Sequence, residues 1–422
     1  MKSRTSASRG SCGCPVLLLY NLDPGWASGD REAALTATDL FIEALRTEGH
    51  PVTPVRVEDV GLRRLLSPYD PFQFVAFNWC EAVPGIPRSE ALAAEALEEL
   101  GFVYTGSSAP VLRLSGNKRK VKDLLRRAGV PTPRGCVCPT ADQVRWNRFP
   151  AIVKPLREHC SVGISPEAVV LDPEALRDRV AYVTETYRQP AVVEEFIDGR
   201  EFRVTIWGNR TLEILPVVEM EFSGFSDLRE RLCTWDAKFT PGSRHYTGIR
   251  TIAPASLRVG ERRQLEAVSR AAYRAMGIRD YARFDFRLRD GVFYLLDPNP
   301  NPDLSSDASL ALTAELAGYS YGRMGGRLVT LAAMRHPVFG GRHSVSGRKP
   351  RPPAGRRRTP ARAVPEPGVR SGHPPLRRRR PGMAAAESRT TVAAETSPPR
   401  RRGTVPRRMG ASPLPATRVF QD

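Results

Sequence analysis

The chain has 422 residues, of which 41% are hydrophobic, so it can bury a sizeable core and is long enough for roughly three domains. Its net charge of +19 is unevenly distributed: residues 341–422 hold 20 Lys and Arg against 4 Asp and Glu, a net of +16, which leaves +3 for residues 1–340. The basic character therefore belongs to the end of the chain, and it does not make the preceding residues a nucleic-acid-binding protein.

The first hundred residues alternate between strand and helix patterns. Residues 16–20 are a continuous apolar run, and residues 74–78 are a second run that ends in polar side chains. Apolar residues at helical spacing over 35–45 and 92–100 are each followed by a glycine. This alternation is typical of a parallel sheet with helices on both faces, so we assign residues 15–113 to an N-terminal α/β domain.

A smaller α+β unit is predicted over residues 114–200. Asn117 can cap a helix, residues 151–154 and 191–195 have the composition of strands, and a second helix begins near Pro173. We expect this central unit to pack against the unit that follows it.

Residues 201–338 predict an antiparallel sheet with one long helix. Apolar and polar side chains alternate over 201–207, and a strand is expected over 212–220. Two further strands, 281–287 and 292–297, are joined by the sequence Asp-Gly, which is a strong hairpin signal.

Residues 339–422 form an Arg/Pro-rich tail. Within it, residues 341–422 contain 14 of the 38 prolines and a single aromatic residue, Phe420. Such a segment cannot bury enough apolar surface to offset the entropy of ordering it, so we expect the tail, like a leader over 1–14, to be disordered. Two interpretations stay open: attachment to nucleic acid or another anionic surface through the tail alone, or a frame slip in a GC-rich coding sequence.

The cysteines and apolar runs exclude further classes. The seven cysteines include two C-x-C pairs, Cys12/Cys14 and Cys136/Cys138, without the histidine or second pair that would complete a zinc site. Reduced thiols explain them best. No apolar run approaches the roughly 20 residues of a membrane span. We therefore expect a cytoplasmic protein.

The predicted hairpin carries the residues most suggestive of chemistry. Pairing of its strands brings Asp285 close to Asp297 and Asn299, which are oxygen ligands of the kind that Mg²⁺ takes when it also holds phosphates. Arg283 lies on the same face of its strand as Asp285 and can meet a developing negative charge. The alternative is a surface hairpin with ordinary charges.

Three other segments can hold a nucleotide. Lys118 at a helix start, and Lys154 with the small-residue loop that follows it, can neutralise and cover a triphosphate. The apolar strand edge 194–197, with Glu201 a few residues later, can hold a base and its ribose. The alternatives are exposed surface lysines and an ordinary edge strand followed by a turn.

The order of these segments resembles the ATP-grasp fold and, more narrowly, the D-alanine–D-alanine ligase family, over residues 16–334. The family's motif Val-Lys-Pro-x-x-Glu-x-x-Ser-x-Gly stands at 153–163. The resemblance implies ATP and two Mg²⁺, or Mn²⁺ in their place. The implied nucleotide-binding residues are Lys118, Lys154, Glu158, Ser161, Glu194, Glu195, Phe196, Ile197 and Glu201. The implied metal ligands are Asp285, Asp297 and Asn299, and the implied catalytic residues are Arg283, Ser161 and Lys238.

The same resemblance implies a two-step reaction. A carboxylate takes the γ-phosphoryl group of ATP, and an amine, or a hydroxyl group, then displaces phosphate from the acyl phosphate to form an amide or an ester. The implied substrates are small amino or hydroxy acids, as in cell-wall precursor or related dipeptide synthesis, and a homodimer is compatible with it.

The sequence departs from the family where the amino acids bind. Glu32 is a poor substitute for the glutamate that holds the first substrate's amine, and Cys160 and Phe239 replace the serine and tyrosine that support it. The Ser-Pro-Gly-Met turn reads Asn-Pro-Asp-Leu at 301–304, and Ala308 replaces a serine that binds the second substrate. Losing these hydroxyls changes recognition. A ligase with other substrates, or a nucleotide-binding protein without ligase activity, therefore stays an alternative.

Overall fold

The computed structural model describes residues 13–240 and 242–341, so the predicted tail beyond residue 341 and the predicted leader before residue 13 lie outside the described residues. Cys14 and Phe339, which the predicted leader and tail include, are instead buried in the core. The predicted class, a mixed α/β protein with an N-terminal parallel sheet, is confirmed. The domain boundaries at residues 113, 200 and 338 stay predictions. Within the described part of the chain, no helix is long and apolar enough to cross a membrane.

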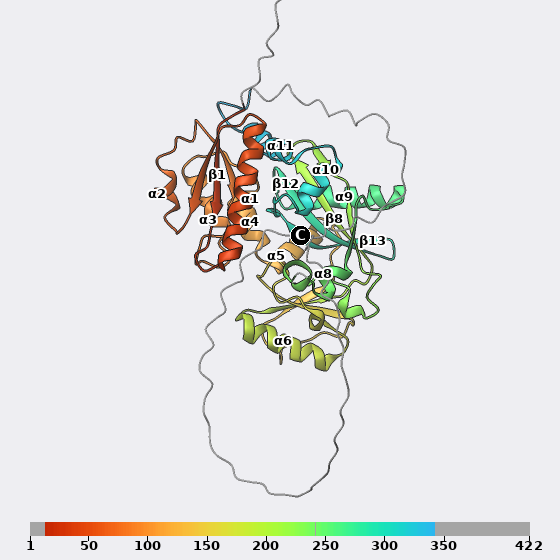
Figure 1. The fold of residues 1–422 in the computed structure, drawn as a ribbon. Helices are drawn as coiled ribbons and strands as arrows, with labels where there is room; N and C mark the ends of the chain where they lie inside the picture. Colours follow the sequence, from red (N-terminus) through yellow and green to blue (C-terminus); the bar gives the residue numbers. More distant parts are fainter. Residues whose placement is uncertain (1–12, 241, 342–422) are drawn as a thin grey trace, which may run out of the picture. The chain divides into compact units, whose positions relative to one another are not determined.

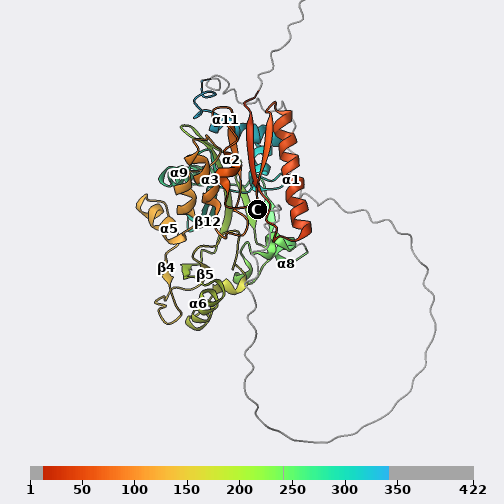
Figure 2. The same ribbon diagram turned by 90° about the vertical axis from the view of Figure 1, so that its left-hand side faces the viewer.

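The N-terminal sheet is parallel, with strands in the order β2-β1-β3. Its strands are β1 (Val16–Asn21), β2 (Val52–Val57) and β3 (Val75–Trp79), and its surrounding helices are α1 (Ser28–Thr47), α2 (Leu62–Leu66), α3 (Glu90–Glu99) and α4 (Ala109–Ser115). Figure 2 shows α1 on one side of the sheet and α2 and α3 on the other. Because both faces are covered, β1 is apolar throughout: Leu18 packs into the core with α1, and Leu17 into the core with α2 and α3.

The last described helix also packs on this sheet. Helix α11 (Tyr321–Ala333) shares the core that contains Phe41 of α1. The two helices approach closely because α11 carries glycine at the contact: a Cβ added to Gly322 would lie 2.6 Å from the carbonyl oxygen of Ala44, and one added to Gly325 would lie 2.8 Å from the Phe41 ring. Residues almost 300 positions apart therefore build one core.

The central sheet is antiparallel, in the order β4-β7-β5-β6. Its strands are β4 (Gly135–Cys138), β5 (Ala151–Pro155), β6 (Val169–Val170) and β7 (Ala191–Glu195). Helix α6 (Pro173–Tyr187) buries Leu176, Val180 and Val183 against it and is capped by Asp172, whose carboxylate accepts from two backbone N–H groups. Helix α5 (Lys118–Arg127) begins at the predicted cap, Asn117.

The third sheet has the order β11-β10-β8-β12-β13, with β9 beside β8. Its strands are β8 (Arg200–Gly208), β9 (Leu212–Ile214), β10 (Val218–Glu221), β11 (Arg250–Ile252), β12 (Tyr281–Arg289) and β13 (Val292–Asn299), and the helices around it are α7 (Asp236–Phe239), α8 (Arg244–Gly248), α9 (Val259–Ala275) and α10 (Ser309–Leu316). Figure 1 places α9 beside β8, β12 and β13. The Phe202 and Phe284 side chains pack into the core with α9, so the other face of the sheet is left for polar residues.

Two details differ from the sequence-based expectation, and both involve proline. Strand β2, which contains Pro54, is not predicted from the sequence. It lies at the edge of the sheet, where a residue without a backbone N–H leaves no hydrogen bond of the sheet unmade. The strand expected over 212–220 is split into β9 and β10, with Pro216 between them. The predicted hairpin is present, and its register shifts after Asp285, where a β-bulge bends the strand.

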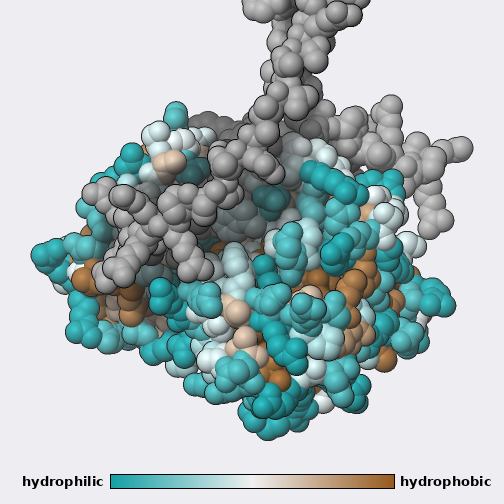
Figure 3. Space-filling view, turned by 90° about the horizontal axis from the view of Figure 1, so that it is seen from below, coloured by the Kyte–Doolittle hydropathy of each residue, from teal (hydrophilic) through white to brown (hydrophobic). Residues whose placement is uncertain are grey.

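The described surface is mixed in polarity. Seen from below, hydrophilic and apolar residues are interspersed, with small apolar patches between charged ones (Figure 3).

Asp280 ties three distant segments together. Its buried carboxylate accepts from the Gly106 backbone N–H at 2.9 Å, from Asn209 Nδ2 at 2.9 Å and from Arg335 Nη2 at 2.8 Å. We expect Asp280→Ala to lower the free energy of unfolding by about 2–3 kcal/mol, because it leaves the Gly106 N–H and the partly exposed Arg335 guanidinium without their acceptor. Urea unfolding measures this. Asp290→Asn, at the exposed hairpin turn, is the control and should change stability by less than about 0.5 kcal/mol; equal effects of the two variants would contradict the assignment.

Candidate functional site

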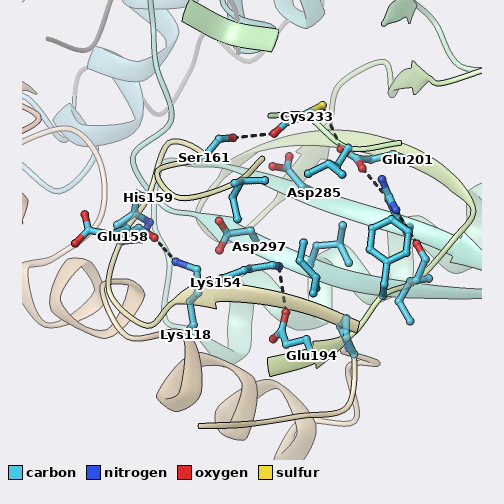
Figure 4. Close-up of a pocket in the computed structure, with 18 of the residues that line it drawn as sticks. Lys118, Lys154, Glu158, His159, Ser161, Glu194, Glu201, Cys233, Asp285 and Asp297 are labelled. Carbon is cyan, nitrogen blue, oxygen red and sulfur yellow. Dashed lines mark hydrogen bonds and ion pairs between the residues drawn. The ribbon is translucent and has the colours of Figure 1, made fainter. Parts of the chain in front are cut away.

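One pocket gathers most of the residues that the sequence singles out. Its cavity volume is about 130 Å³, and its mouth is open to solvent. Its walls come from the central sheet, the third sheet and the loop after β5 (Figure 4). The predicted residues that line it are Lys118, Lys154, Glu158, Ser161, Glu194, Glu195, Phe196, Ile197, Glu201, Lys238, Asp285 and Asp297. Arg283 and Asn299 lie farther along the same strands as Asp285 and Asp297.

The floor of the pocket is the polar face of the third sheet. Strands β8 and β12 are antiparallel neighbours, and their register sets Glu201 opposite Arg287 and Arg203 opposite Asp285. On the other side of β12, Asp285 is paired with Asp297 of β13. Opposite charges thus face each other across β8 and β12, which is favourable, whereas Asp285 and Asp297 are like charges that face each other across β12 and β13, which is unfavourable.

Asp285, Asp297 and Asn299 form an oxygen-rich set at one end of this floor. Both oxygens of Asp285 accept from Arg283, at 3.1 and 3.3 Å, and Asn299 Oδ1 accepts from the Asn301 backbone N–H at 3.0 Å. No group of three or more His, Cys, Asp or Glu side chains that could hold a metal occurs among the described residues. Two carboxylates and an amide oxygen fit Mg²⁺, which commonly takes its remaining ligands from water and phosphate.

The opposite wall carries a cluster of three buried or partly buried charges. Glu194 accepts from Lys154 at 3.1 Å and lies 3.3 Å from Lys122 (Figure 4 draws the first pair). Burial opposes ionisation of Glu194, but the two lysines outweigh it and lower its pKa to about 2. Burial lowers the pKa of Lys122 to about 8. The carboxylate of Glu194 therefore holds the two lysines in position. The sequence predicts a different role for Glu194, namely contact with the base of the nucleotide.

Lys118 completes the cationic wall. Its Nζ donates to the backbone oxygen of Glu158, and burial lowers its pKa while the nearby Asp297 opposes that change. A cation between the loop after β5 and the carboxylates of β13 is well placed to contact phosphate oxygens. Sequence reasoning missed Lys122, although it lies one helical turn after Lys118 and so on the same face of α5.

The loop after β5 is held from both sides. Glu158 Oε1 accepts from Arg88 Nη1 at 2.7 Å and from Gln189 Nε2 at 2.6 Å, and Ser161 Oγ donates to the backbone oxygen of Cys233 at 3.0 Å. Cys160 and Ser161 have φ angles of 54° and 59°. Non-glycine residues in this left-handed region are uncommon, and strained backbone is often found at functional loops.

The end of the pocket beside residues 194–197 contains an arginine that sequence reasoning missed. Arg287 is 2% exposed; it donates from Nε to Glu201 at 2.8 Å and from Nη1 to the Ile197 backbone oxygen at 2.8 Å. Its guanidinium carbon lies 4.7 Å from the centre of the Phe196 ring, a cation–π distance. Arg287 thereby fixes the carboxylate that the sequence assigns to a ribose. The available signal was its spacing of two residues from Asp285 on one strand face.

The residues that the resemblance assigns to substrate binding lie in different surroundings. Glu32 lies on the exposed surface of α1 and does not line the pocket. Ala308 is buried as the N-cap of α10, while Asp303 accepts from the backbone N–H and the hydroxyl of Ser305 at 2.9 and 2.5 Å. The side chain of Phe239 lies outside the described residues.

The sequence of the chain is similar to those of known proteins. A family model described as the D-ala D-ala ligase C-terminus matches residues 136–330. An uncharacterized protein, y4sG, of Sinorhizobium fredii is 34% identical over 306 residues, covering 71% of this chain and 88% of that protein. The D-alanine–D-alanine ligase of Gluconobacter oxydans is 30% identical over 307 residues, covering 70% of this chain and 93% of the ligase.

A solved structure supports the fold. The D-alanine–D-alanine ligase from Bacillus anthracis, complexed with ATP, superposes with a TM-score of 0.59 at 18% identity, over 76% of this chain and 97% of that one. With the sequence matches, this shows that the chain belongs to the D-alanine–D-alanine ligase family and has the ATP-grasp fold.

Proposed function

We propose that this protein is an ATP-dependent ligase that joins a carboxylate to an amine through an acyl phosphate. The observation that carries the proposal is the meeting of Lys118 and Lys154 with Asp285 and Asp297 in one pocket between two sheets. Cations on one wall and carboxylates on the other suit a triphosphate with its metal ions.

ATP would lie along the floor of the pocket. The segment 194–197 borders the space for the base, and Glu201, fixed by Arg287, lies where a ribose can be bound. Lys118, Lys154 and Lys238 would contact the phosphates, with the Ser161 loop above them. Asp285, Asp297 and Asn299 would hold Mg²⁺, which when bound neutralises phosphate charge.

The residues of the chain would act mainly by position and charge. In the first step a carboxylate oxygen bonds to the γ-phosphorus, the bond from that phosphorus to the bridging oxygen breaks, and ADP leaves with the electron pair. In the second step the amine nitrogen bonds to the acyl carbon, phosphate leaves, and the nitrogen loses a proton. Arg283, whose guanidinium group lies beside Asp285, would stabilise the negative charge in both steps.

The substrates would be small amino acids, with D-alanine or a relative as the first candidate. The second candidate function is nucleotide binding without ligation. Three residues support this second candidate: Cys160 and Ala308 lack hydroxyls that the family uses to hold amino acids, and Asp303 replaces the glycine of the family's turn.

A substrate panel tests the ligase proposal. We expect ADP release from Mg-ATP that depends on an added amino acid, in a panel of D- and L-amino acids and hydroxy acids, with the condensed product identified by mass spectrometry. Tight Mg-ATP binding without turnover across the whole panel would instead select the second candidate.

Asp285→Asn tests the metal-binding end of the pocket. We expect kcat to fall by roughly 100-fold or more, because one charged metal ligand is lost from a reaction that depends on electrostatic stabilisation. The fold should be retained, since Asp285 is partly exposed. Asp290→Asn on the same hairpin is the matched control; a Asp285→Asn enzyme within a few-fold of wild type would remove this residue from the site.

Glu194 makes the free energy of unfolding sensitive to acid. Its pKa is about 2 in the folded chain, below the ordinary value of 4.5, so its contribution to stability is complete above about pH 4.5 and is lost as the pH falls toward 2. The free energy of unfolding should fall by up to about 1.4 kcal/mol per pH unit in this window. Glu194→Gln should flatten that dependence, and Glu185→Gln on exposed α6 should not. Parallel curves for wild type and Glu194→Gln would refute the ion-pair assignment.

A further inference from the structure

Arg203 is a buried cation in the pocket whose hydrogen-bond partners are neutral. Its side chain lines the pocket and is 5% exposed. Nη1 lies 3.2 Å from Ser309 Oγ and Nη2 lies 3.7 Å from Cys233 Sγ, while Nε has no hydrogen-bond partner in the part of the chain that the structure describes. A hydroxyl and a thiol do not neutralise a guanidinium group.

The two other buried arginines on this sheet face are arranged differently. Arg283 has the carboxylate of Asp285 at 3.1 Å, and Arg287 has that of Glu201 at 2.8 Å. Asp285 stands opposite Arg203, but its two oxygens accept from Arg283. Burying a cation without a paired anion is costly, so a ligand that supplies the negative charge would be favoured beside Arg203. The surroundings of Arg203 therefore suit an oxyanion.

The register of the sheet indicates which oxyanion. Arg203 stands directly opposite Asp285, which in turn stands opposite Asp297, so the guanidinium is at the level of the predicted metal ligands. Burial raises the pKa of the Cys233 thiol, and the positive charges of Arg203 and Lys238 both oppose that rise, so the two cations act on the same part of the pocket. Glu201, the predicted ribose ligand, lies two cross-strand pairs away, on the same face of the sheet.

We propose that Arg203 binds the terminal phosphoryl group of the nucleotide while it is transferred. The inference rests on the proposed function and adds a residue to it. A planar guanidinium presents paired N–H groups to two phosphate oxygens, which a lysine cannot do. Here it would stabilise the charge on the γ-phosphoryl oxygens while the bond to the bridging oxygen breaks and the bond to the substrate carboxylate forms.

The other oxyanion within reach would be a carboxylate of the amine substrate. Ser309 is the first residue of α10, whose N-cap Ala308 provides no side-chain cap. We favour the phosphoryl group over the carboxylate because Arg203 stands opposite Asp285, a predicted metal ligand. The experiment below distinguishes these two anions.

The test uses nucleotides of increasing phosphate number. In calorimetry with Mg²⁺, we expect Arg203→Gln to weaken binding of a non-hydrolysable ATP analogue by roughly 10- to 100-fold, ADP less, and AMP by less than about 2-fold. Arg203→Lys should recover only part of the loss. Arg200→Gln is the matched control, since Arg200 is on the same strand but is half-exposed and paired with Glu219 outside the pocket.

Each result decides the inference. Equal losses for AMP and the analogue, or unchanged nucleotide binding with a raised KM for the amine substrate, would overturn it. The thermal unfolding temperature of Arg203→Gln without nucleotide should equal or exceed that of wild type, and Arg203→Lys provides the comparison if the glutamine variant unfolds early. If wild type binds the analogue and Arg203→Gln binds it equally, only this inference fails; if wild type binds no nucleotide, the proposed function fails as well.

Discussion

The two-residue period of β8 and β12 is the constraint on which the rest of the structure depends. Phe202 and Phe284 point into the core with α9. The residues next to each of them along the strand must therefore point to the opposite face of the sheet. Because the two strands are held in one register, Glu201 and Asp285 arrive on the same floor from distant parts of the sequence. A slip of one residue would bury these charges and expose the aromatic rings, so packing of the core and placement of the charged groups are one requirement.

The pocket is built by balancing charges inside a partly dry space. Glu194 sits between Lys122 and Lys154, and the attraction of the two lysines exceeds the cost of burying its carboxylate. Such a cluster keeps flexible lysine side chains in place before any anion arrives, which lowers the entropy cost of binding one. The floor follows a similar pattern, with Arg203 as the exception because its hydrogen-bond partners are uncharged.

Sequence patterns predicted the sheets better than they predicted the charged network. Long apolar or alternating segments predicted the three sheets and the hairpin. The edge strand β2, which contains Pro54, was not predicted, and the strand predicted over 212–220 ran through Pro216, where the structure divides it into β9 and β10. Residues that belong to a motif of the family could be assigned to the pocket from the order of the motifs along the sequence. Lys122, Arg203 and Arg287 could not, because an arginine or lysine is normally exposed and its burial depends on contacts made across sheets.

The glycine contacts of α11 have a consequence for how the protein is made. Phe41 and Leu45 of α1 belong to a core that is completed by Leu328 and Val329, which the ribosome releases almost last among the described residues. Until then, the core between the N-terminal sheet and α1 lacks the α11 residues that complete it, although the strands and α1 are already synthesised. The N-terminal sheet must therefore wait in an incomplete state with exposed apolar surface, the kind of intermediate that chaperones bind.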